Sequence, residues 1–507
     1  MIQVVLCFII GVYSIYKLVQ WRNEKTGKNI PGPHGLPLIG CANEVRADNI
    51  HLKLMEYAEQ YGEIFQLKML VKNFIVLNSE SILRLAFADE HYKQYFNDRA
   101  QMFFGHHFRC RNQSIGMISD GAGKGHKIGR KEFAKAIHAY GSGLQKLEDN
   151  VMTEMELLVK RIERMPGKEF QCLELFRRSL TNTMSLVLNG DVIDDNDPNI
   201  EMMWQHVQGA DFFLNSKVNL LMKVLPFLRF LPGKLRAEYE NCKKAQGNIL
   251  QRYFYETKKS HVSGEIRGIV DHYLDVQSKE IESGNEVFFT DERIIAQIIE
   301  TIDAGTATTW SFLTNSMLVL VNIPEYQTKI QEELDRVIGR ERLPNYTDRG
   351  RCTFLKAFCM EVLRYLTVAP LLLPHYCRKN LVFEGYNIKS NSMVLGNVWY
   401  IHHDEKIWGD PWAFRPERFL DEDGKILSND HKLIRNYLPF GHGQRQCPGS
   451  QFAKTRYFLY LATLLQRWNF EIPNGKKKGC DPRNSDVFDM RLILKAKPFS
   501  VRAKERV

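Results

Sequence analysis

The segment from residue 290 to residue 321 constrains the fold of this 507-residue chain more than any other feature. It is long, apolar on most of its helical faces, and ends at the sequence "NIPEY". A helix that is hydrophobic on all sides has to be buried. We therefore expect this segment to cross the interior of one large domain, and the chain is long enough to bury such a core.

The remaining pattern is mostly helical, with small β-sheets. Apolar positions at helical spacing predict helices in residues 51–62, 143–165, 326–339 and 354–366, and another that starts at Gln451. Short strands are predicted in 64–78 and 381–398, whereas 404–435 is irregular and rich in Pro, Trp and Asp. No linker, repeat or low-complexity tract follows residue 38, so residues 39–507 are expected to form a single domain.

Residues 1–22 are predicted to form an N-terminal membrane anchor. Apolar residues dominate from Ile2 to about Val19, which is near the minimum of roughly 17–20 residues that span a bilayer. Positive charges follow this run and place the downstream chain on the cytosolic side. A signal peptide or a peripheral segment is the alternative. Residues 23–38, basic and rich in Pro and Gly, are expected to connect the anchor to the domain.

The charge and the cysteine pattern narrow the class of protein. The formal net charge is +10, but Lys and Arg are spread along the chain without an arginine-rich tail, so a nucleic-acid partner is not expected. An acidic protein or an anionic lipid fits this charge better. The ten cysteines are scattered without a CxxC pair, which indicates reduced thiols in a reducing compartment.

One cysteine has a special setting. Cys447 lies in the sequence "FGHGQRQCPG", where Phe440, Gly443, Arg445 and Gly449 surround it directly before a predicted helix. A glycine-rich turn and a helix N-terminus favour a thiolate, which is a strong metal ligand. A structural role is the usual interpretation of a lone cysteine, but five matching positions in one decapeptide favour a ligand.

At these residues the chain resembles the cytochrome P-450 superfamily, the heme-thiolate monooxygenases, and it looks like the microsomal animal type. The resemblance implies the cytochrome P-450 fold, a single heme domain with a long central helix. It also implies heme b (iron protoporphyrin IX) as the cofactor, with Cys447 as the axial ligand of the iron. An endoplasmic reticulum membrane location, with the catalytic domain facing the cytosol, is expected for this type.

Independent motifs support the resemblance. Glu361 and Arg364 form an E-x-x-R pair on one face of a predicted helix. Such a pair is usually an ion pair on the solvent-exposed surface of a helix. In "FRPERF", however, Arg418 matches the family position of a second arginine, which joins the Glu–Arg pair as its third member. The resemblance implies that these three residues form a structural cluster that locks the irregular segment before the cysteine loop.

The sequence "DAGTATTW" (303–310) in the long apolar segment predicts a local helix distortion, because glycine and threonine are poor helix formers. Thr308 matches the family threonine that helps to deliver protons to iron-bound oxygen, although a threonine can also bond to its own helix. Ala307 stands where the family usually has an acid. Asp303 lies four residues earlier, about one helical turn, so it cannot simply replace that acid. The sequence leaves three routes for proton delivery: through water, through Asp303 or through the substrate.

Several cations match family positions that contact the heme carboxylates: Arg99, Arg130, His375 and Arg445. The guanidinium fork suits a carboxylate. His126 stands where the family usually has a tryptophan, and a histidine can also donate a hydrogen bond to a carboxylate. Phe440 is expected to shield one side of the cysteine sulfur.

The stretch "GKGHKIGRKEFAK" (123–135) is densely basic. A solvated helix face is the default interpretation, but in the family this region lies on the cysteine side, where an acidic flavoprotein docks. The resemblance implies NADPH-cytochrome P-450 reductase as a partner, with cytochrome b5 as a second one. The chain has no phosphate loop or dinucleotide fingerprint, so NADPH would act through the reductase.

The main hypothesis is a monooxygenase that inserts one oxygen atom from O2 into a lipophilic substrate: a sterol or steroid, fatty acid, terpenoid or xenobiotic. The pocket is expected to contain apolar residues such as Phe103, Phe104, Phe213 and Leu371. The alternatives are an isomerase or dehydratase that acts on a peroxide, and a non-catalytic heme- or lipid-binding protein.

The stretch "LPFLRFLPG" (225–233) is either a core-facing loop or a surface patch that contacts membrane lipid.

Overall fold

A computed structural model describes residues 27–70, 72–118, 123–138, 145–284, 286–475 and 479–506. The expected anchor, residues 1–22, lies outside these ranges, as does the first part of the connector 23–38. Within the described ranges, no helix combines the length and the apolar character that a membrane crossing requires.

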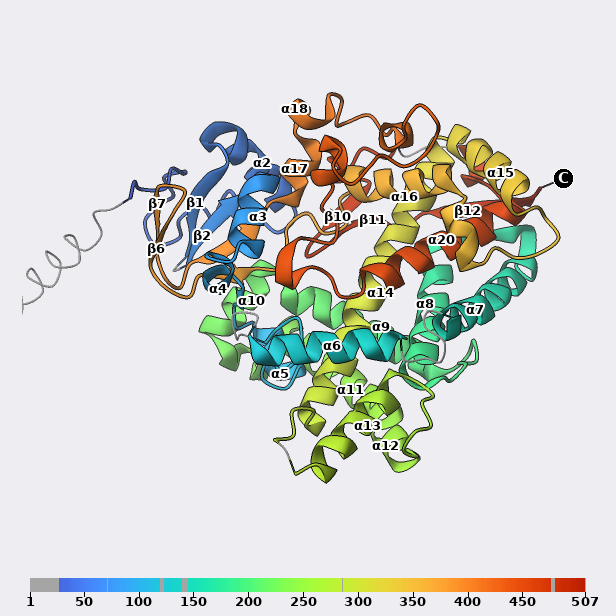
Figure 1. Cartoon of the computed structure of the whole chain (residues 1–507), viewed down its shortest axis with the longest axis horizontal. Helices are drawn as coiled ribbons and strands as arrows, with labels where there is room; N and C mark the ends of the chain where they lie inside the picture. The colour runs from blue at the N-terminus through green and yellow to red at the C-terminus, as the bar shows by residue number, and fades with distance from the viewer. Residues whose placement is uncertain are drawn as a thin grey trace, which may run out of the picture.

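Helices make up most of the structure, as the sequence predicts (Figure 1). The longer α-helices are α2 (Ile50–Tyr61), α3 (Glu80–Ala88), α6 (Lys124–His138), α7 (Gln145–Glu163), α8 (Cys172–Asn189), α9 (Pro198–Leu214), α10 (Ser216–Val224), α11 (Lys234–Leu250), α13 (Ile269–Glu282), α14 (Asp291–Asn322), α15 (Glu325–Val337), α16 (Thr353–Tyr365) and α20 (Ser450–Arg467). The shorter ones are α4 (Lys93–Phe96), α5 (Phe103–Phe108), α12 (Thr257–Lys259), α17 (Val398–His403), α18 (Glu405–Trp408) and α19 (Lys432–Arg435).

Short 3-10 turns occur at η1 (Pro166–Lys168), η2 (Pro226–Phe230), η4 (Tyr346–Gly350), η5 (Pro416–Phe419), η6 (Gly443–Arg445) and η7 (Pro473–Gly475), and η3 (Gln251–Glu256) is a π-helical segment. The strands are β1 (Ile64–Met69), β2 (Lys72–Leu77), β3 (Asp98–Arg99), β4 (Glu169–Gln171), β5 (His375–Tyr376), β6 (Leu381–Phe383), β7 (Tyr386–Ile388), β8 (Met393–Gly396), β9 (Trp468–Glu471), β10 (Phe488–Met490), β11 (Leu494–Ala496) and β12 (Ser500–Glu505).

The largest sheet has five strands in the order β1-β2-β8-β5-β3 and lies at one end of the molecule (Figure 1). Its β2 and β8 strands are parallel, with Phe74 opposite Met393, and its other pairs are antiparallel. The smaller sheets are β4-β12-β9, β10-β11 and β6-β7. Strands β3 and β5 matter for the site, because they place Arg99 opposite His375.

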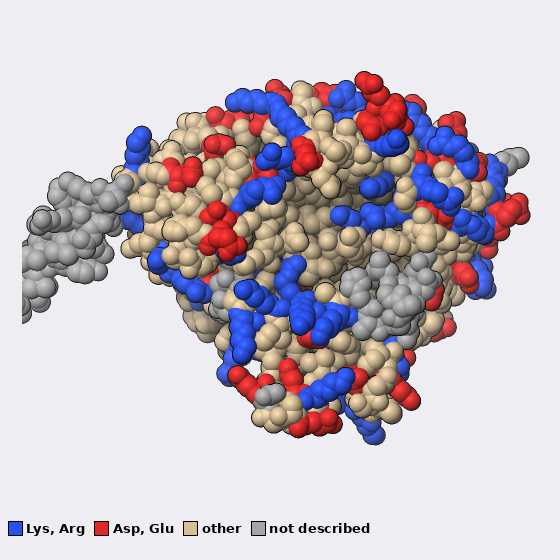
Figure 2. Space-filling view, in the orientation of Figure 1, with Lys and Arg blue, Asp and Glu red and all other residues tan. Residues whose placement is uncertain are grey.

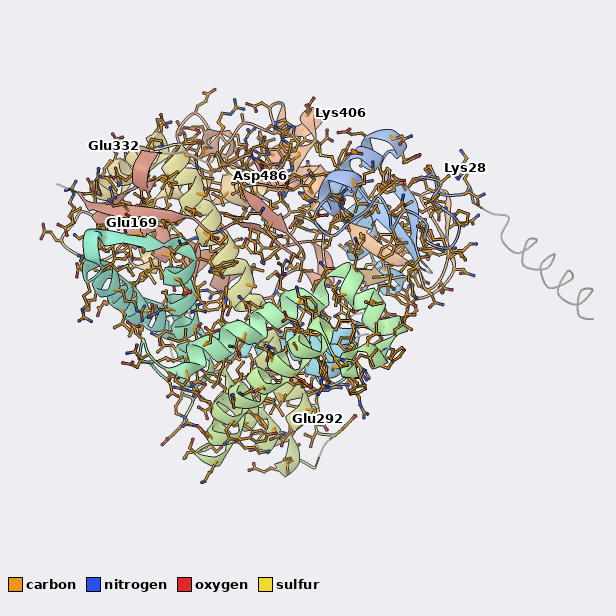
Figure 3. All side chains as sticks on the ribbon, turned by 180° about the vertical axis from the view of Figure 1, so that it is seen from behind. Lys28, Glu169, Glu292, Glu332, Lys406 and Asp486 are labelled. Carbon is orange, nitrogen blue, oxygen red and sulfur yellow. The ribbon has the colours of Figure 1, made fainter. Side chains whose placement is uncertain are left out.

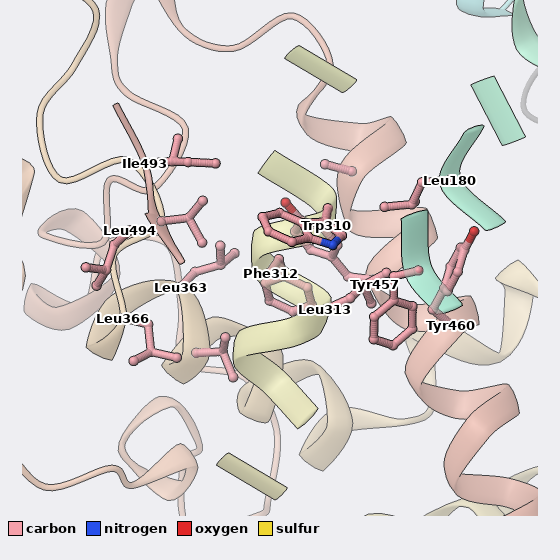
Figure 4. Close-up of a cluster of buried hydrophobic side chains, with 14 of the residues drawn as sticks. Leu180, Trp310, Phe312, Leu313, Leu363, Leu366, Tyr457, Tyr460, Ile493 and Leu494 are labelled. Carbon is pink, nitrogen blue, oxygen red and sulfur yellow. The ribbon is translucent and has the colours of Figure 1, made fainter. Parts of the chain in front are cut away.

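The helix α14 crosses the middle of the molecule, as its apolar pattern predicts (Figure 1). The helix α9 packs against α14, and α11 packs against α9. Seen from behind, labelled charged residues such as Glu169 and Lys406 lie at the edge (Figure 3). The largest hydrophobic core surrounds α14. There Phe312 stacks on Tyr457 of α20 with ring centroids 3.6 Å apart (Figure 4). Burial of such large aromatic side chains is the main source of stability for a core of this kind.

The predicted helices and strands are confirmed within a few residues, and 404–435 contains nothing longer than one-turn helices. One alternative is wrong. The stretch 225–233 does not face the core, because Phe227, Phe230 and Leu231 are about half exposed at 52%, 63% and 49%. The cysteines that the structure describes are all free thiols, in agreement with the scattered spacing.

Candidate functional site

The loop that carries Cys447 is shaped by glycine. Gly441 and Gly443 have φ values of +71° and +76°, a region that side-chain-bearing residues rarely adopt. A Cβ atom on Gly443 would lie 2.5 Å from the carbonyl oxygen of Phe87. The amide of Cys447 donates to the carbonyl oxygen of Phe440 at 2.8 Å, so the thiol sits in a tight turn three residues before α20 begins.

Burial raises the pKa of the Cys447 thiol above its ordinary value. The amide of Gly449 and the charges of Arg130 and Lys454 oppose this effect without outweighing it. The glycine turn and the nearby cations therefore act in the expected direction, towards a thiolate, whereas burial in the surrounding fold acts against it. A metal ion bound to the sulfur would provide the missing stabilisation, since coordination deprotonates a thiol.

Buried cations gather next to this loop, and they come from segments far apart in the sequence. Burial, followed by repulsion from Arg445, lowers the pKa of Arg99 to about 9. Burial and three neighbouring guanidinium groups, those of Arg445, Arg130 and Arg99, lower the pKa of His126 to about 3. The local potential is therefore strongly positive and favours an anionic ligand.

Backbone carbonyl oxygens orient these cations. Arg445 donates to the carbonyl oxygens of Asn97, Ile115 and Ile118 at 3.0, 3.1 and 2.7 Å. Arg99 donates from Nη1 to the carbonyl oxygen of Leu373 at 2.6 Å. These bonds fix the two side chains within one rigid cluster.

The other predicted ligand-holding residues border the same place. Arg130 donates to the carbonyl oxygen of Gln446 at 2.5 Å, directly beside Cys447. His375 is buried, its Nδ1 lies 2.7 Å from the carbonyl oxygen of Phe96, and its ring stacks on Phe87 at 3.9 Å. Phe440 is partly buried, and the Lys454 ammonium group lies 5.1 Å from its ring centroid. The structure thus brings together the residues from four distant segments that the sequence singles out.

The Glu361 carboxylate forms the predicted cluster. It accepts hydrogen bonds from Nε and Nη2 of Arg364 at 2.7 and 2.8 Å and from Nε of Arg418 at 3.1 Å. The side chains of Glu361 and Arg364 are fully buried. Arg418 also donates to Asp410 and to the carbonyl oxygen of Trp408 at 3.2 and 3.1 Å. The cluster therefore joins α16 to the irregular segment that leads to Cys447.

The helix α14 has an exposed patch in its middle, although it crosses the core. Ala304 is exposed and Thr308 is half-buried, whereas Ile302 and Phe312 are completely buried. The Thr308 hydroxyl donates to the carbonyl oxygen of Ala304 at 2.7 Å. The α-helix is continuous from Asp291 to Asn322, so the predicted distortion is wrong. The hydroxyl bonds to the helix without interrupting the backbone ladder.

Asp303 points away from this patch into a buried ion network. Its Oδ2 accepts from Arg109 at 2.9 Å, and its Oδ1 lies 3.4 Å from Nε2 of His206 on α9. Burial opposes the charge on His206, but Asp303 and then Cys242 raise its pKa to about 10. Asp303 is therefore held by two cations and lies apart from Thr308.

The sequence did not indicate Arg109, His206 or Glu300 as members of this network. Glu300 accepts hydrogen bonds from Nη1 of Arg109, the Ser114 hydroxyl and the Gly116 amide at 3.0, 3.0 and 2.8 Å. It thereby holds the 114–116 segment against α14. The one available signal was a pair of acids, Glu300 and Asp303, within an apolar helix, which implies buried cationic partners but does not identify them.

Comparison with known proteins identifies the family. The family model for cytochrome P450 matches residues 30–502. The chain belongs to the cytochrome P450 family. A steroid 17-alpha-hydroxylase/17,20 lyase of Squalus acanthias is 30% identical over 93% of this chain and 90% of its own length. Cytochrome P450 1A1 of Macaca mulatta is 30% identical over 93% of this chain and 92% of its own length. The steroid 17-alpha-hydroxylase/17,20 lyase of Gallus gallus is 30% identical and covers 96% of both chains.

This cytochrome P450 is an enzyme, a monooxygenase, and its family uses a heme-thiolate cofactor. The described residues fit that group. A thiol in a tight glycine turn suits the iron, and the positive potential around His126 suits the heme carboxylates. At Ala304 and Thr308 the surface of α14 is not fully covered by other side chains.

Replacing Glu361 tests the buried cluster. Glu361→Gln leaves the Arg364 and Arg418 guanidinium groups without their carboxylate, which is expected to cost about 3–5 kcal/mol. Urea unfolding of the purified protein, together with its heme content, measures the loss. Glu417→Gln is the matched control, since it removes an exposed pair with Lys329 and should cost less than about 1 kcal/mol. Equal losses in both variants would contradict the role of the cluster.

The network around His206 predicts a pH dependence of stability. Because its folded pKa of about 10 exceeds the ordinary value of 6.5, the His206 contribution is complete below pH 6.5 and disappears as the pH rises towards 10. We expect the thermal midpoint of His206→Gln to lie below that of the wild type at pH 6.5 and to approach it by pH 10. His34→Gln, at an exposed histidine, is the control. Its thermal midpoint should differ from that of the wild type by the same amount at pH 6.5 and at pH 10.

Proposed function

We propose that this cytochrome P450 binds heme b with Cys447 as the thiolate ligand of the iron. Arg99, Arg130, His375 and Arg445 would hold the carboxylates, with His126 as a further donor. The observation that carries this proposal is the buried cationic cluster beside a glycine-shaped cysteine loop. When bound, heme supplies the chemistry that activates O2 and inserts one of its atoms into a C–H bond.

Proton delivery is assigned to residues of α14. Thr308 lies on the exposed patch of α14, where its hydroxyl can turn from the Ala304 carbonyl towards a bound water. We assign proton transfer to Thr308 and water. Asp303 is a poor direct donor because its carboxylate is engaged by Arg109 at 2.9 Å and lies 3.4 Å from Nε2 of His206, in a network apart from Thr308.

The substrate is proposed to be lipophilic: a sterol or steroid, fatty acid, terpenoid or xenobiotic. Leu371, Leu372 and Leu373 are partly exposed, and the carbonyl oxygen of Leu373 accepts a hydrogen bond from the Arg99 guanidinium, so this apolar segment borders the cationic cluster. The rings of Phe103 and Phe213 lie 5.5 Å apart in a separate apolar cluster between α5 and α9. The names of the relatives, a steroid hydroxylase among them, agree with such a substrate.

Electrons are proposed to come from NADPH through cytochrome P-450 reductase, with cytochrome b5 as a second donor. Lys124, Lys127 and Lys131 are exposed on α6, and Lys and Arg gather over this helix on the face shown in Figure 2. Arg130 on the same helix contacts the loop of Cys447, so a partner that binds α6 would be close to the thiolate. An acidic flavoprotein complements this surface.

We further propose that residues 1–22 anchor the enzyme in the endoplasmic reticulum membrane, that residues 23–38 form the connector, and that the catalytic domain lies in the cytosol. The exposed apolar residues of α10 and η2, which include Val224, Phe227 and Phe230, would contact lipid. Lys223 of α10 lies close enough to Lys72 in β2 for their charges to repel. The exposed Ile39 lies at the same β1–β2 turn, because its carbonyl oxygen accepts a hydrogen bond from the Leu70 amide. We propose that this side of the molecule faces the membrane.

A peroxide isomerase or dehydratase is the second candidate. Ala307 supplies no acid, and Asp303 is occupied by cations, which suits a reaction that needs no proton from the protein. The requirement for NADPH and reductase separates the two. Turnover of a hydroperoxide without either would favour the second candidate.

Replacing the proposed ligand tests the heme assignment. Cys447→Ser should abolish the characteristic absorbance of the carbon-monoxide complex and reduce NADPH-dependent turnover at least a hundredfold, because a serine hydroxyl is a far weaker iron ligand. Cys480→Ser, at another partly buried thiol, is the control and should retain both. Retention of both signals by Cys447→Ser would refute the assignment.

Charge reversal tests the reductase surface. The triple variant Lys124→Glu, Lys127→Glu and Lys131→Glu should raise the apparent KM for reductase roughly tenfold at low salt, and the difference should shrink as ionic strength rises. Reversal of Lys244, Lys259 and Lys279, which are exposed on other helices, changes the net charge equally and is the control. If both triple variants behave alike, the α6 surface is not the docking site.

A further inference from the structure

A buried cation lies behind the exposed patch of α14. Arg456 of α20 is 1% exposed, and burial lowers its pKa to about 10, so the guanidinium stays charged at neutral pH. Among the residues that the structure describes, the only ionisable side chains that shift its pKa are Tyr457 and Tyr460, and no carboxylate is paired with it. A buried charge of this kind is costly unless hydrogen bonds stabilise it.

The hydrogen bonds of Arg456 converge on α14. Its Nη2 donates to the carbonyl oxygen of Gly305 and to the hydroxyl of Thr309, both at 2.7 Å. Its Nη1 lies 3.8 Å from the sulfur of Met184 on α8, and the guanidinium stacks over the Phe452 ring at 3.9 Å. A Cβ atom on Gly305 would lie 3.2 Å from that sulfur, so glycine permits the close packing at this point.

These contacts connect the two sides of the proposed heme site. Arg456 belongs to the helix that begins three residues after Cys447, and it bonds to residues on either side of Thr308. The neighbouring stack of Tyr457 on Phe312 fixes the same pair of helices (Figure 4). The position of α20, and with it that of the cysteine loop, is therefore coupled to one specific turn of α14.

The turn from Ala304 to Thr309 has no carboxylate of its own. Ala307 has no polar side chain, and Asp303 is paired with Arg109 and His206. The strongest polar contact on this turn is therefore the one from Arg456. A charged donor on the Gly305 carbonyl holds that peptide plane in place. The adjacent Ala304 carbonyl, which accepts the Thr308 hydroxyl, belongs to the same turn.

We propose that Arg456 is a positioning residue for proton delivery: it holds the Gly305–Thr309 turn so that the Thr308 hydroxyl faces the heme side. This inference rests on the proposed role of Thr308. It predicts two separate effects of removing the guanidinium, a looser helical turn and a poorer use of electrons from NADPH.

Hydrogen exchange measures the first effect and does not depend on activity. In the purified heme-loaded protein, Arg456→Met should speed exchange of the amides from residue 305 to residue 310 about tenfold, and Arg456→Lys should restore part of the protection. Gln466→Met is the matched control, because Gln466 is buried on the same helix and donates to the carbonyl oxygens of Gly339 and Arg342 instead. It should leave the 305–310 amides unchanged.

The second effect is measured as hydrogen peroxide released per NADPH oxidised in the presence of reductase. We expect this ratio to rise several-fold in Arg456→Met, to fall back in Arg456→Lys and to stay at the wild-type value in Gln466→Met. A purely structural role would lower the yield of folded protein without changing this ratio.

A milder variant covers the case in which Arg456→Met does not fold. Thr309→Val keeps the cation and the side-chain shape but removes one acceptor, and it should raise both exchange and peroxide release about threefold. Wild-type exchange at 305–310 in these variants, or an unchanged peroxide ratio, would overturn the inference. If the wild type oxidises no NADPH with reductase, the proposed function fails, whereas the exchange measurement still decides whether Arg456 holds the turn.

Discussion

Glu361 holds two guanidinium groups in a place that water does not reach, and the geometry of the site depends on this arrangement. The segment between α17 and α20 contains no long helix that could position it through regular packing. Its path is fixed instead by Arg418, which bonds to Glu361 on one side and to backbone carbonyls of its own segment on the other. Because a buried ion cluster tolerates little displacement, the loop with Cys447 is held in a defined position before α20.

Charge placement distinguishes three regions around α14. The cluster with Arg99 and Arg445 is positive and suits a ligand with carboxylates. The network of Asp303, Arg109 and His206 pairs its charges within the protein, so it joins α9 and α14 to the residue that follows α5. Arg456 has no carboxylate partner within the described part of the chain, and its charge is stabilised by a carbonyl, a hydroxyl and an aromatic ring. Each region thus stabilises buried charge in a different way.

The sequence predicted the elements well where one face or all faces of a helix are apolar, as in α14 and α2, because burial of those faces determines the structure. It failed where a local preference was outweighed by packing. The threonines of the 303–310 segment suggested a distorted helix, but bonds from Arg456 and to the Ala304 carbonyl accommodate them in a regular one. Likewise, the sequence indicates the local groups that favour a thiolate at Cys447, but it does not indicate the opposing effect of burial, which depends on the surrounding fold.

The sequence by itself determined the family-specific chemistry: a cysteine between glycines, an E-x-x-R pair with a later arginine, and cations at recognisable positions. These signals are local, because a turn or a helical face requires particular residues at short spacing. The tertiary structure alone decided which charges meet. Arg109 with Asp303, and Arg456 with Gly305, are separated by 194 and 151 positions in the chain. Their partners depend on how helices pack in three dimensions, and no short motif encodes that packing.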